Sequence, residues 1–191
     1  LALGENPTVK DRKLNELTVR ILPLQGGEFY HFGTSKELIS STLAIQNRIV
    51  DQRSILHKDQ KPHPSMFIQN ADVKIKLGNH QRNLWIENSY INENWQIDSD
   101  HIITGIPKND WPIKLDQGIC LDISPIGKDH YCIRPYGFND RFKGQIDSAE
   151  TIWMGKPLSD WLAIRGLSIS DLSDKAVDIQ AANLFPLLKK E

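Results

Sequence analysis

The sequence contains few of the features that mark several large protein classes. Only two of its 191 residues are cysteines, Cys120 and Cys132. Two cysteines are too few for the disulfide framework that holds small secreted domains together. Each has an aliphatic neighbour, so we expect two reduced thiols in the core, and a single bridge between neighbouring strands is the alternative.

The sequence also lacks an excess of charge of either sign. It has 23 Lys and Arg residues against 24 Asp and Glu residues, whereas nucleic-acid-binding domains usually carry a clear basic excess. No apolar run approaches the roughly 20 residues of a membrane span, and no N-terminal signal pattern is present. We therefore expect a cytoplasmic protein that binds neither nucleic acid nor membrane. Because residue 1 is Leu, not Met, we expect a processed chain or a piece of a longer one.

Common catalytic motifs are missing as well. The sequence has no G-x-S-x-G, no Walker A and no G-x-G-x-x-G pattern. Its six histidines lack the spacing of a metal site. One of them, His101, borders a predicted strand and is expected at the surface or in a turn.

The N-terminal part has the pattern of a hairpin followed by a helix. Residues 17–22 and 28–32 are predicted as two strands around Pro23 and a Gly26-Gly27 turn. Thr34 and Glu37 have capping-box spacing, and apolar residues then recur at helical intervals, which predicts a helix over residues 35–57. A Gly-Thr corner at a helix start can bind a phosphate or sugar oxygen, although an ordinary strand-to-helix turn explains it equally well.

From residue 66 the chain repeats at intervals of 16–19 residues. Each repeat has an aliphatic residue, a small residue three positions later and a second apolar stripe, which in the last repeat is Tyr131 and Ile133. The aliphatic positions are Ile68, Ile86, Ile102 and Leu121, and the small ones are Ala71, Ser89, Gly105 and Ser124. The recurrence indicates the stacked coils of a parallel β-helix, with Asn70 and Asn88 as a hydrogen-bonded ladder. A β-sandwich with evenly spaced strands is the alternative.

The C-terminal part has a helical pattern. It predicts a helix over residues 157–166 that ends at Gly166 and another from about Ser170, and the helical pattern continues over residues 178–185. We expect these helices to cap the β-helix. The predicted fold is therefore mainly β, with a hairpin and helix in residues 1–64, a single-stranded parallel β-helix in 65–145 and a helical segment in 146–191.

Two functional hypotheses follow from the β-helix itself. Glu87 and Asp122 are candidates for the paired carboxylates of a polysaccharide lyase or hydrolase, although outward-facing polar residues are expected on any strand. Trp85, Tyr90 and Trp95 are candidates for a carbohydrate-binding face, although tryptophans with repeat spacing usually belong to the core.

Five segments resemble a known family. They are residues 29–35 (FYHFGTS), 43–46 (LAIQ), 51–53 (DQR), 84–89 (LWIENS) and 134–140 (RPYGFND). They resemble the middle of the bifunctional L-fucokinase/L-fucose-1-phosphate guanylyltransferases, also called GDP-fucose pyrophosphorylases, and the likeness covers about residues 17–188. In that family a nucleotidyltransferase joins fucose 1-phosphate to GTP, a β-helical region follows, and a kinase makes fucose 1-phosphate with ATP.

This resemblance implies that the chain is the end of the transferase part plus the β-helix, with a left-handed coil. The glycine-rich motifs of both catalytic parts are absent from the sequence. The resemblance therefore implies that this chain alone is inactive, that Mg²⁺, GTP and ATP serve the parent enzyme, and that the partners are the rest of that polypeptide and a sugar phosphate. Self-association is left open.

The resemblance also points to one group of site residues. Related sugar-nucleotide pyrophosphorylases end their catalytic domain with an aromatic–acid–Asp–aliphatic–Gly–Thr pattern, which residues 30–34 resemble. The Asp that faces sugar or metal in those relatives is His31 here, and imidazole is a poorer Mg²⁺ ligand than carboxylate. The resemblance thus implies that His31, Gly33 and Thr34 bind the substrate through its sugar, without a metal.

Overall fold

The computed structural model of the chain describes residues 13, 18, 20–48, 63–173, 175 and 177–189. The chain divides into two compact units, Leu1–Tyr30 and His31–Glu191. In the described part of the first unit, a turn at Gln25 and Gly26 is closed by a hydrogen bond from the Gly27 N–H to the Leu24 carbonyl (3.2 Å).

The paired strands expected over residues 17–32 are not found among the described residues of that range. An isolated two-stranded hairpin is only marginally stable in water and needs further strands or a helix to cover its apolar face. The large apolar side chains of this segment are exposed instead. They are Ile21, Leu22, Leu24, Phe29 and Phe32.

The second unit begins with helix α2 (Ser35–Arg48), at the position that the sequence predicts. The Glu37 N–H donates to Thr34 Oγ1 (3.2 Å), and the Thr34 hydroxyl donates to Glu37 Oε2 (3.0 Å), so Thr34 caps the helix. The predicted extension to residue 57 lies outside the described residues. Ile39 of α2 is buried against the outer face of the sheet, beside Phe67 and Ile102.

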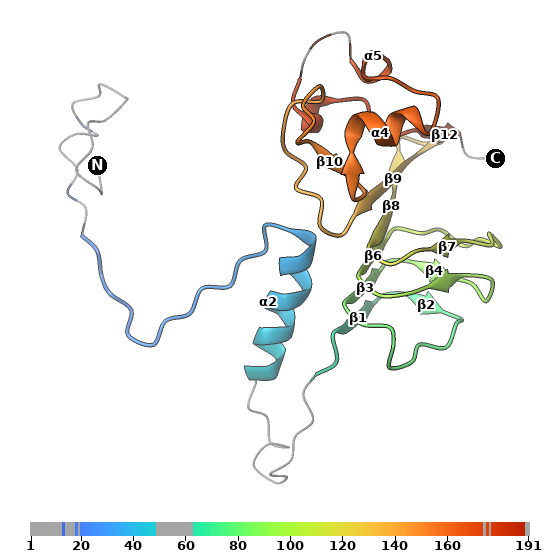
Figure 1. Ribbon diagram of the computed structural model, residues 1–191. Coiled ribbons are helices and arrows are strands. Elements are labelled where there is room, and N and C mark those ends of the chain that lie inside the picture. Colours follow the sequence, from blue (N-terminus) through green and yellow to red (C-terminus); the bar gives the residue numbers. More distant parts are fainter. Residues whose placement is uncertain are drawn as a thin grey trace. The chain divides into compact units, whose positions relative to one another are not determined.

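The parallel β-helix is confirmed. Strands β1 (Met66–Gln69), β3 (Leu84–Glu87), β6 (His101–Thr104) and β8 (Ile119–Ile126) pair in parallel in that order. Two short pairs form the other sides of the coils (Figure 1). They are β2 (Asp72–Val73) with β4 (Tyr90–Ile91), and β5 (Gln96–Ile97) with β7 (Lys114–Leu115).

One repeat was aligned wrongly from the sequence. The register pairs Ile68 with Ile86, Ile86 with Ile103, and Ile103 with Leu121, so Ile103 and not Ile102 occupies the aliphatic column. A slip of one residue moves a side chain to the other face of a strand. The pattern hid this slip because both isoleucines are buried, Ile103 inside the coil and Ile102 against α2.

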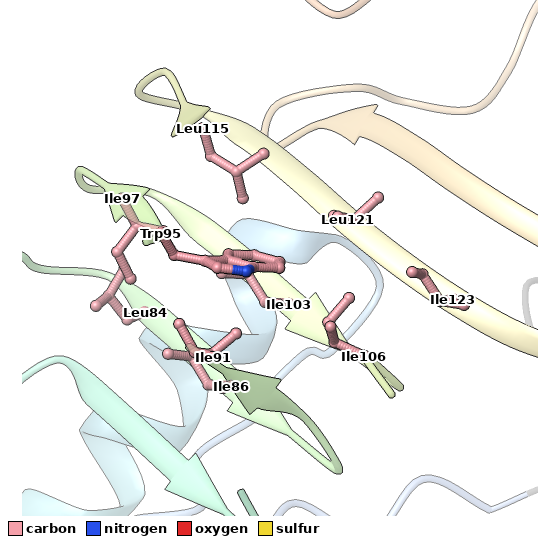
Figure 2. Close-up of a cluster of buried hydrophobic side chains, with 10 residues drawn as sticks. All are labelled: Leu84, Ile86, Ile91, Trp95, Ile97, Ile103, Ile106, Leu115, Leu121 and Ile123. Atoms are coloured by element: carbon pink, nitrogen blue, oxygen red, sulfur yellow. The ribbon is translucent and has the colours of Figure 1, made fainter. Parts of the chain in front are cut away.

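The interior of the coils is filled by one apolar cluster (Figure 2). Full burial of one large apolar side chain stabilises a fold by about 1.5–3 kcal/mol, so stacked coils gain stability with every added rung. Trp95 lies within this cluster. The buried members are Leu84, Ile86, Ile91, Trp95, Ile97, Ile103, Ile106, Leu115, Leu121 and Ile123.

The coil corners stack residues with positive φ angles. One column follows the strands and the other precedes them, and short polar side chains or glycine tolerate this conformation best. The first column is Asn70, Asn88 and Gly105, and the second is Asn83, Asp100 and Gly118. Asn70 Nδ2 donates to Asn88 Oδ1 (2.5 Å), which confirms the predicted ladder, and Asn83 Nδ2 donates to Asp100 Oδ1 (2.7 Å).

Strands rather than helices extend the sheet beyond β8. Strand β9 (His130–Gly137) pairs antiparallel with β8, and β12 (Leu187–Lys189) pairs antiparallel with β9. Tyr131 and Ile133, expected as the second apolar stripe of the last parallel coil, instead lie on a returning antiparallel strand. This arrangement satisfies the backbone groups that the edge of β8 would otherwise expose.

The C-terminal helices are present but short. Strands β10 (Ile152–Trp153) and β11 (Lys156–Pro157) precede α4 (Leu158–Ala163). The helix ends three residues before the predicted stop at Gly166, which has a positive φ (+69°) in the turn that follows. Helix α5 (Ile169–Leu172) follows, and the helical pattern of residues 178–185 gives only a 3₁₀ turn, η1 (Ile179–Ala181). These elements pack around Trp153 in a cluster of their own.

The two cysteines are free thiols, as expected. Cys120 is buried and pairs with Tyr136 across the ladder, whereas Cys132 is partly buried and pairs with Ser124. Their positions on the ladder are four rungs apart, so the alternative of a bridge is wrong. Burial raises the pKa of the Cys120 thiol to about 12, which keeps it protonated and unreactive at neutral pH.

The expectation that His101 lies at the surface is wrong. Its side chain is fully buried, with Nδ1 2.6 Å from the Ile119 carbonyl and Nε2 2.9 Å from the Asp98 N–H. These partners assign the proton to Nδ1 and a neutral ring. Burial lowers the pKa of His101 below its usual 6.5, against the opposing effects of the Ile119 carbonyl, Asp98 and Asp100.

We therefore expect stability to depend on pH through His101. Below about pH 6.5 the unfolded chain takes up a proton that the folded chain does not, so the free energy of unfolding falls as the pH decreases and is constant above that value. Urea denaturation at pH 7.5, 6.5 and 5.5 measures the decline. His101→Gln should show a smaller decline than the native chain, and an equal decline in both would contradict this prediction.

Candidate functional site

The predicted site residues Gly33 and Thr34 lie on a cavity of about 410 Å³ at the start of α2. The residues before α2 and its first turn form one side, the outer faces of β6, β8 and β9 form another, and two phenylalanines of the C-terminal part complete it. The lining residues are Phe32, Gly33, Thr34, Ser35, Leu38, Ile102, Thr104, Asp122, Arg134, Tyr136, Phe142 and Phe185.

Strand alternation explains which side chains reach the cavity. Side chains two residues apart on a strand point to the same face, so Ile102 and Thr104 of β6 reach it together, as do Arg134 and Tyr136 of β9. Asp122 enters from β8, directly opposite Arg134 in the antiparallel ladder.

An ion pair lies in the wall of the cavity. Arg134 Nε and Nη2 lie 2.7 and 2.6 Å from Asp122 Oδ2. Thr104 Oγ1 donates to Asp122 Oδ1 (2.5 Å) and Ser124 Oγ to Oδ2 (2.8 Å). Burial alone would raise the pKa of Asp122, but these hydroxyls and the guanidinium outweigh it and lower the pKa below its usual value. Asp122 is therefore a carboxylate at neutral pH.

His31, the third predicted site residue, is not among the lining residues. Its Nδ1 lies 2.9 Å from Glu37 Oε2, and its imidazole lies directly beside Gly33, where a Cβ atom would overlap it. The Thr34 hydroxyl lowers the pKa of Glu37, desolvation opposes this, and His31 adds to the lowering. The capping carboxylate thus positions both His31 and Thr34.

Most residues of the other wall of the cavity were not predicted from the sequence. Arg134 and Tyr136 were noticed only as part of a resembling segment, and Thr104 was not singled out. Tyr136 lines the cavity together with Ser35 at the start of α2, and burial raises its pKa. The sequence holds one signal for these residues: Arg134 and Tyr136 are two positions apart and so share a face of their strand. That signal points to the cavity only when it is known that β9 returns antiparallel to β8.

The residues of the alternative functional hypotheses are held in other contacts. Glu87 and Asp122 lie two rungs apart with Thr104 between them, and the lowered pKa of Asp122 is opposite to what a general acid needs at neutral pH. Trp95 is buried inside the coil, whereas Trp85 packs against Phe67 on the outer face. These tryptophans therefore cannot form one sugar-binding face.

The part of the chain that the structure describes lacks two kinds of feature. No group of three or more His, Cys, Asp and Glu side chains gathers there as a metal site would require. No helix in the described ranges is both long and apolar enough to cross a membrane.

Comparisons with known proteins give consistent results. A family model for the fucose pyrophosphorylase domain matches residues 10–190. An L-fucokinase/L-fucose-1-P guanylyltransferase of Bacteroides fragilis is 50% identical over 188 residues, which is 98% of this chain. The chain spans only 20% of that relative's length. No solved structure matches the chain.

Proposed function

The chain belongs to the fucose pyrophosphorylase domain family, and from this premise we propose that it is the β-helical part of a GDP-fucose pyrophosphorylase. The parent enzyme joins L-fucose 1-phosphate and GTP to give GDP-fucose and pyrophosphate, and also carries a fucokinase. The observation that carries this proposal is the 50% identity over nearly the whole chain to a protein of that name. The chain matches only 20% of that relative's length, so the remainder is long enough for a transferase part and a kinase part.

Within such an enzyme this chain is a non-catalytic part that packs against the transferase. The exposed apolar side chains of residues 20–32 support this role, because apolar surface of this kind marks an interaction site. The reaction is an attack of the sugar phosphate oxygen on the α-phosphorus of GTP, with pyrophosphate as leaving group. Mg²⁺ would neutralise phosphate charge, but the described residues offer no carboxylate cluster for it, so we assign the metal, GTP and ATP to the rest of the parent.

We also propose a cytoplasmic location, where the nucleotides GTP and ATP are available, and neither a nucleic-acid nor a membrane partner. The near balance of 23 basic and 24 acidic residues supports this choice. The proposed role does not depend on the handedness of the coil or on whether the protein self-associates.

The direct test is an assay of the parent polypeptide. Pyrophosphate release would be followed with GTP and a panel of sugar 1-phosphates. We expect turnover with L-fucose 1-phosphate above that with the other sugars. Turnover with a different sugar 1-phosphate, and none with that of L-fucose, would show that the proposed activity is wrong.

The corner of His31, Gly33 and Thr34 is proposed to contact the sugar of the substrate. Its support is the position of Gly33 and Thr34 on the cavity and of His31 beside Gly33. In the parent enzyme, we expect His31→Ala to raise the KM for L-fucose 1-phosphate up to about tenfold, as the loss of one hydrogen bond would. The KM for GTP should be unchanged. Steady-state kinetics measure both constants.

His130→Ala is the matched control, because His130 is exposed at the far end of β9 and is absent from the cavity lining. It should have native kinetic constants. An unchanged KM for the sugar phosphate in His31→Ala would remove His31 from the site.

A further inference from the structure

We propose that the cavity at the start of α2 holds the sugar ring of the substrate, and that the β-helix supplies the binding pair Asp122 and Arg134. The inference rests on the function proposed above and extends it, since it gives the β-helix a direct part in substrate recognition. It also names the part of the substrate that the cavity takes, an uncharged deoxyhexose ring rather than a phosphate or a nucleotide.

The charges of the cavity exclude a phosphate-rich ligand. Asp122 and Arg134 are the only lining residues that are charged at neutral pH, and they neutralise each other at 2.6–2.7 Å. A phosphate site presents an excess of cationic donors. A lining without net charge suits an uncharged part of the ligand.

The hydrogen-bonding groups suit adjacent sugar hydroxyls. A hydroxyl both donates and accepts, so two neighbouring hydroxyls pair well with a carboxylate and a guanidinium placed side by side. Arg134 has five N–H donors, and only Nε and Nη2 are directed at Asp122. Further donors of Arg134 remain for a ligand, and its side chain is 46% exposed. The hydroxyls of Thr34, Ser35 and Tyr136 line the same cavity.

The remaining wall is apolar and suits the C–H face of a sugar. Phe142 and Phe185 line the cavity together with Leu38, and aromatic rings bind amphipathic ligands through their apolar faces. Phe142 is held by edge-to-face contacts with Trp153 (ring centres 4.8 Å apart) and Tyr136 (5.9 Å). A deoxyhexose places a methyl group where other hexoses have a hydroxymethyl, and that methyl would lie against this wall.

The binding pair is held in place before any ligand arrives. Asp122 and Arg134 are opposite residues of the longest antiparallel ladder in the described fold, and Thr104 and Ser124 fix both oxygens of the carboxylate. A site built on strands and supported by neighbouring hydrogen bonds keeps its geometry. The volume, about 410 Å³, lies within the range of small-molecule sites.

The test uses the intact parent enzyme and the variant Arg134→Gln. Loss of a charged hydrogen-bonding group should raise the KM for L-fucose 1-phosphate by about 10–100-fold and leave the KM for GTP unchanged. Lys114→Gln is the matched control, since Lys114 forms a comparable but exposed pair with Asp116 (3.3 Å) away from the cavity. A native KM for the sugar phosphate in Arg134→Gln, or a rise in the KM for GTP alone, would overturn the proposal.

The apolar wall has its own test. D-arabinose 1-phosphate has the ring of L-fucose 1-phosphate without the methyl group, and burial of one such group is worth about 0.8 kcal/mol, or about fourfold in affinity. We expect its KM to be about fourfold higher in the native parent. Equal values would contradict the methyl contact.

A second readout does not depend on turnover. Hydrogen–deuterium exchange of the parent with saturating L-fucose 1-phosphate should slow in residues 31–38 and 130–137, and this protection should be lost in Arg134→Gln. Protection that persists in the variant, or none in the native enzyme, would overturn the proposed cavity. If the native enzyme releases pyrophosphate but shows no such protection, the proposed function stands and the proposed cavity is wrong. Protection without release of pyrophosphate would instead support the cavity and remove the proposed function.

Discussion

Gly105→Ala is expected to lower the free energy of unfolding by about 3 kcal/mol or more. Gly105 follows β6 with φ +69°, in the corner column of Asn70 and Asn88. A Cβ atom there would overlap the backbone carbonyl oxygen of Ile123 in the next coil. The left-handed conformation costs a residue with a Cβ about 1–2 kcal/mol, and the forced separation of two coils adds about 1–3 kcal/mol. Urea denaturation measures the loss.

Gly118→Ala is the matched control for this substitution. Gly118 also has a positive φ (+80°), but a Cβ atom there would meet nothing within 4 Å. We expect it to cost only the conformational part, about 1–2 kcal/mol. If both variants lost the same stability, the close approach of coils at Gly105 would play no part.

Ile86→Ala should cost about 3 kcal/mol, within the usual range for a buried aliphatic residue. Ile86 is fully buried between Ile68 and Ile103 in the aliphatic column. Ile68 occupies the equivalent position on the first coil, but its side chain is 45% exposed. We therefore expect Ile68→Ala to cost about 1 kcal/mol. Chemical denaturation of both variants gives the difference, and equal losses would contradict the stacked register.

The repeat could be predicted because the core of a β-helix has the same period as its sequence. Ile68, Ile86 and Leu121 occupy one column as expected, and the Asn70–Asn88 ladder follows from the same repeat. The error at Ile102 arose where two faces of one strand are both buried. The spacing of apolar residues cannot distinguish the inner face of a strand from its outer face where α2 buries the outer face as well.

Features that depend on distant or unrepeated contacts could not be predicted. Burial of His101 depends on its bonds to Asp98 and Ile119, which a repeat pattern does not reveal. The cavity was only half predicted, because Gly33 and Thr34 belong to a local corner whereas Arg134 reaches it through the antiparallel return of β9. The pairing expected over residues 17–32 is not found in the described residues of that range, because a hairpin needs neighbours that the sequence pattern does not supply.

We propose that this chain completes the sugar site of the transferase without carrying its chemistry. The most direct measurement expresses the proposed upstream transferase part separately and follows pyrophosphate release from GTP and L-fucose 1-phosphate, with and without this chain. We predict no turnover by the chain alone and a clear increase when it is added to the upstream part, greatest at low sugar phosphate. Full activity of the upstream part alone, or turnover by this chain alone, would rule out this role.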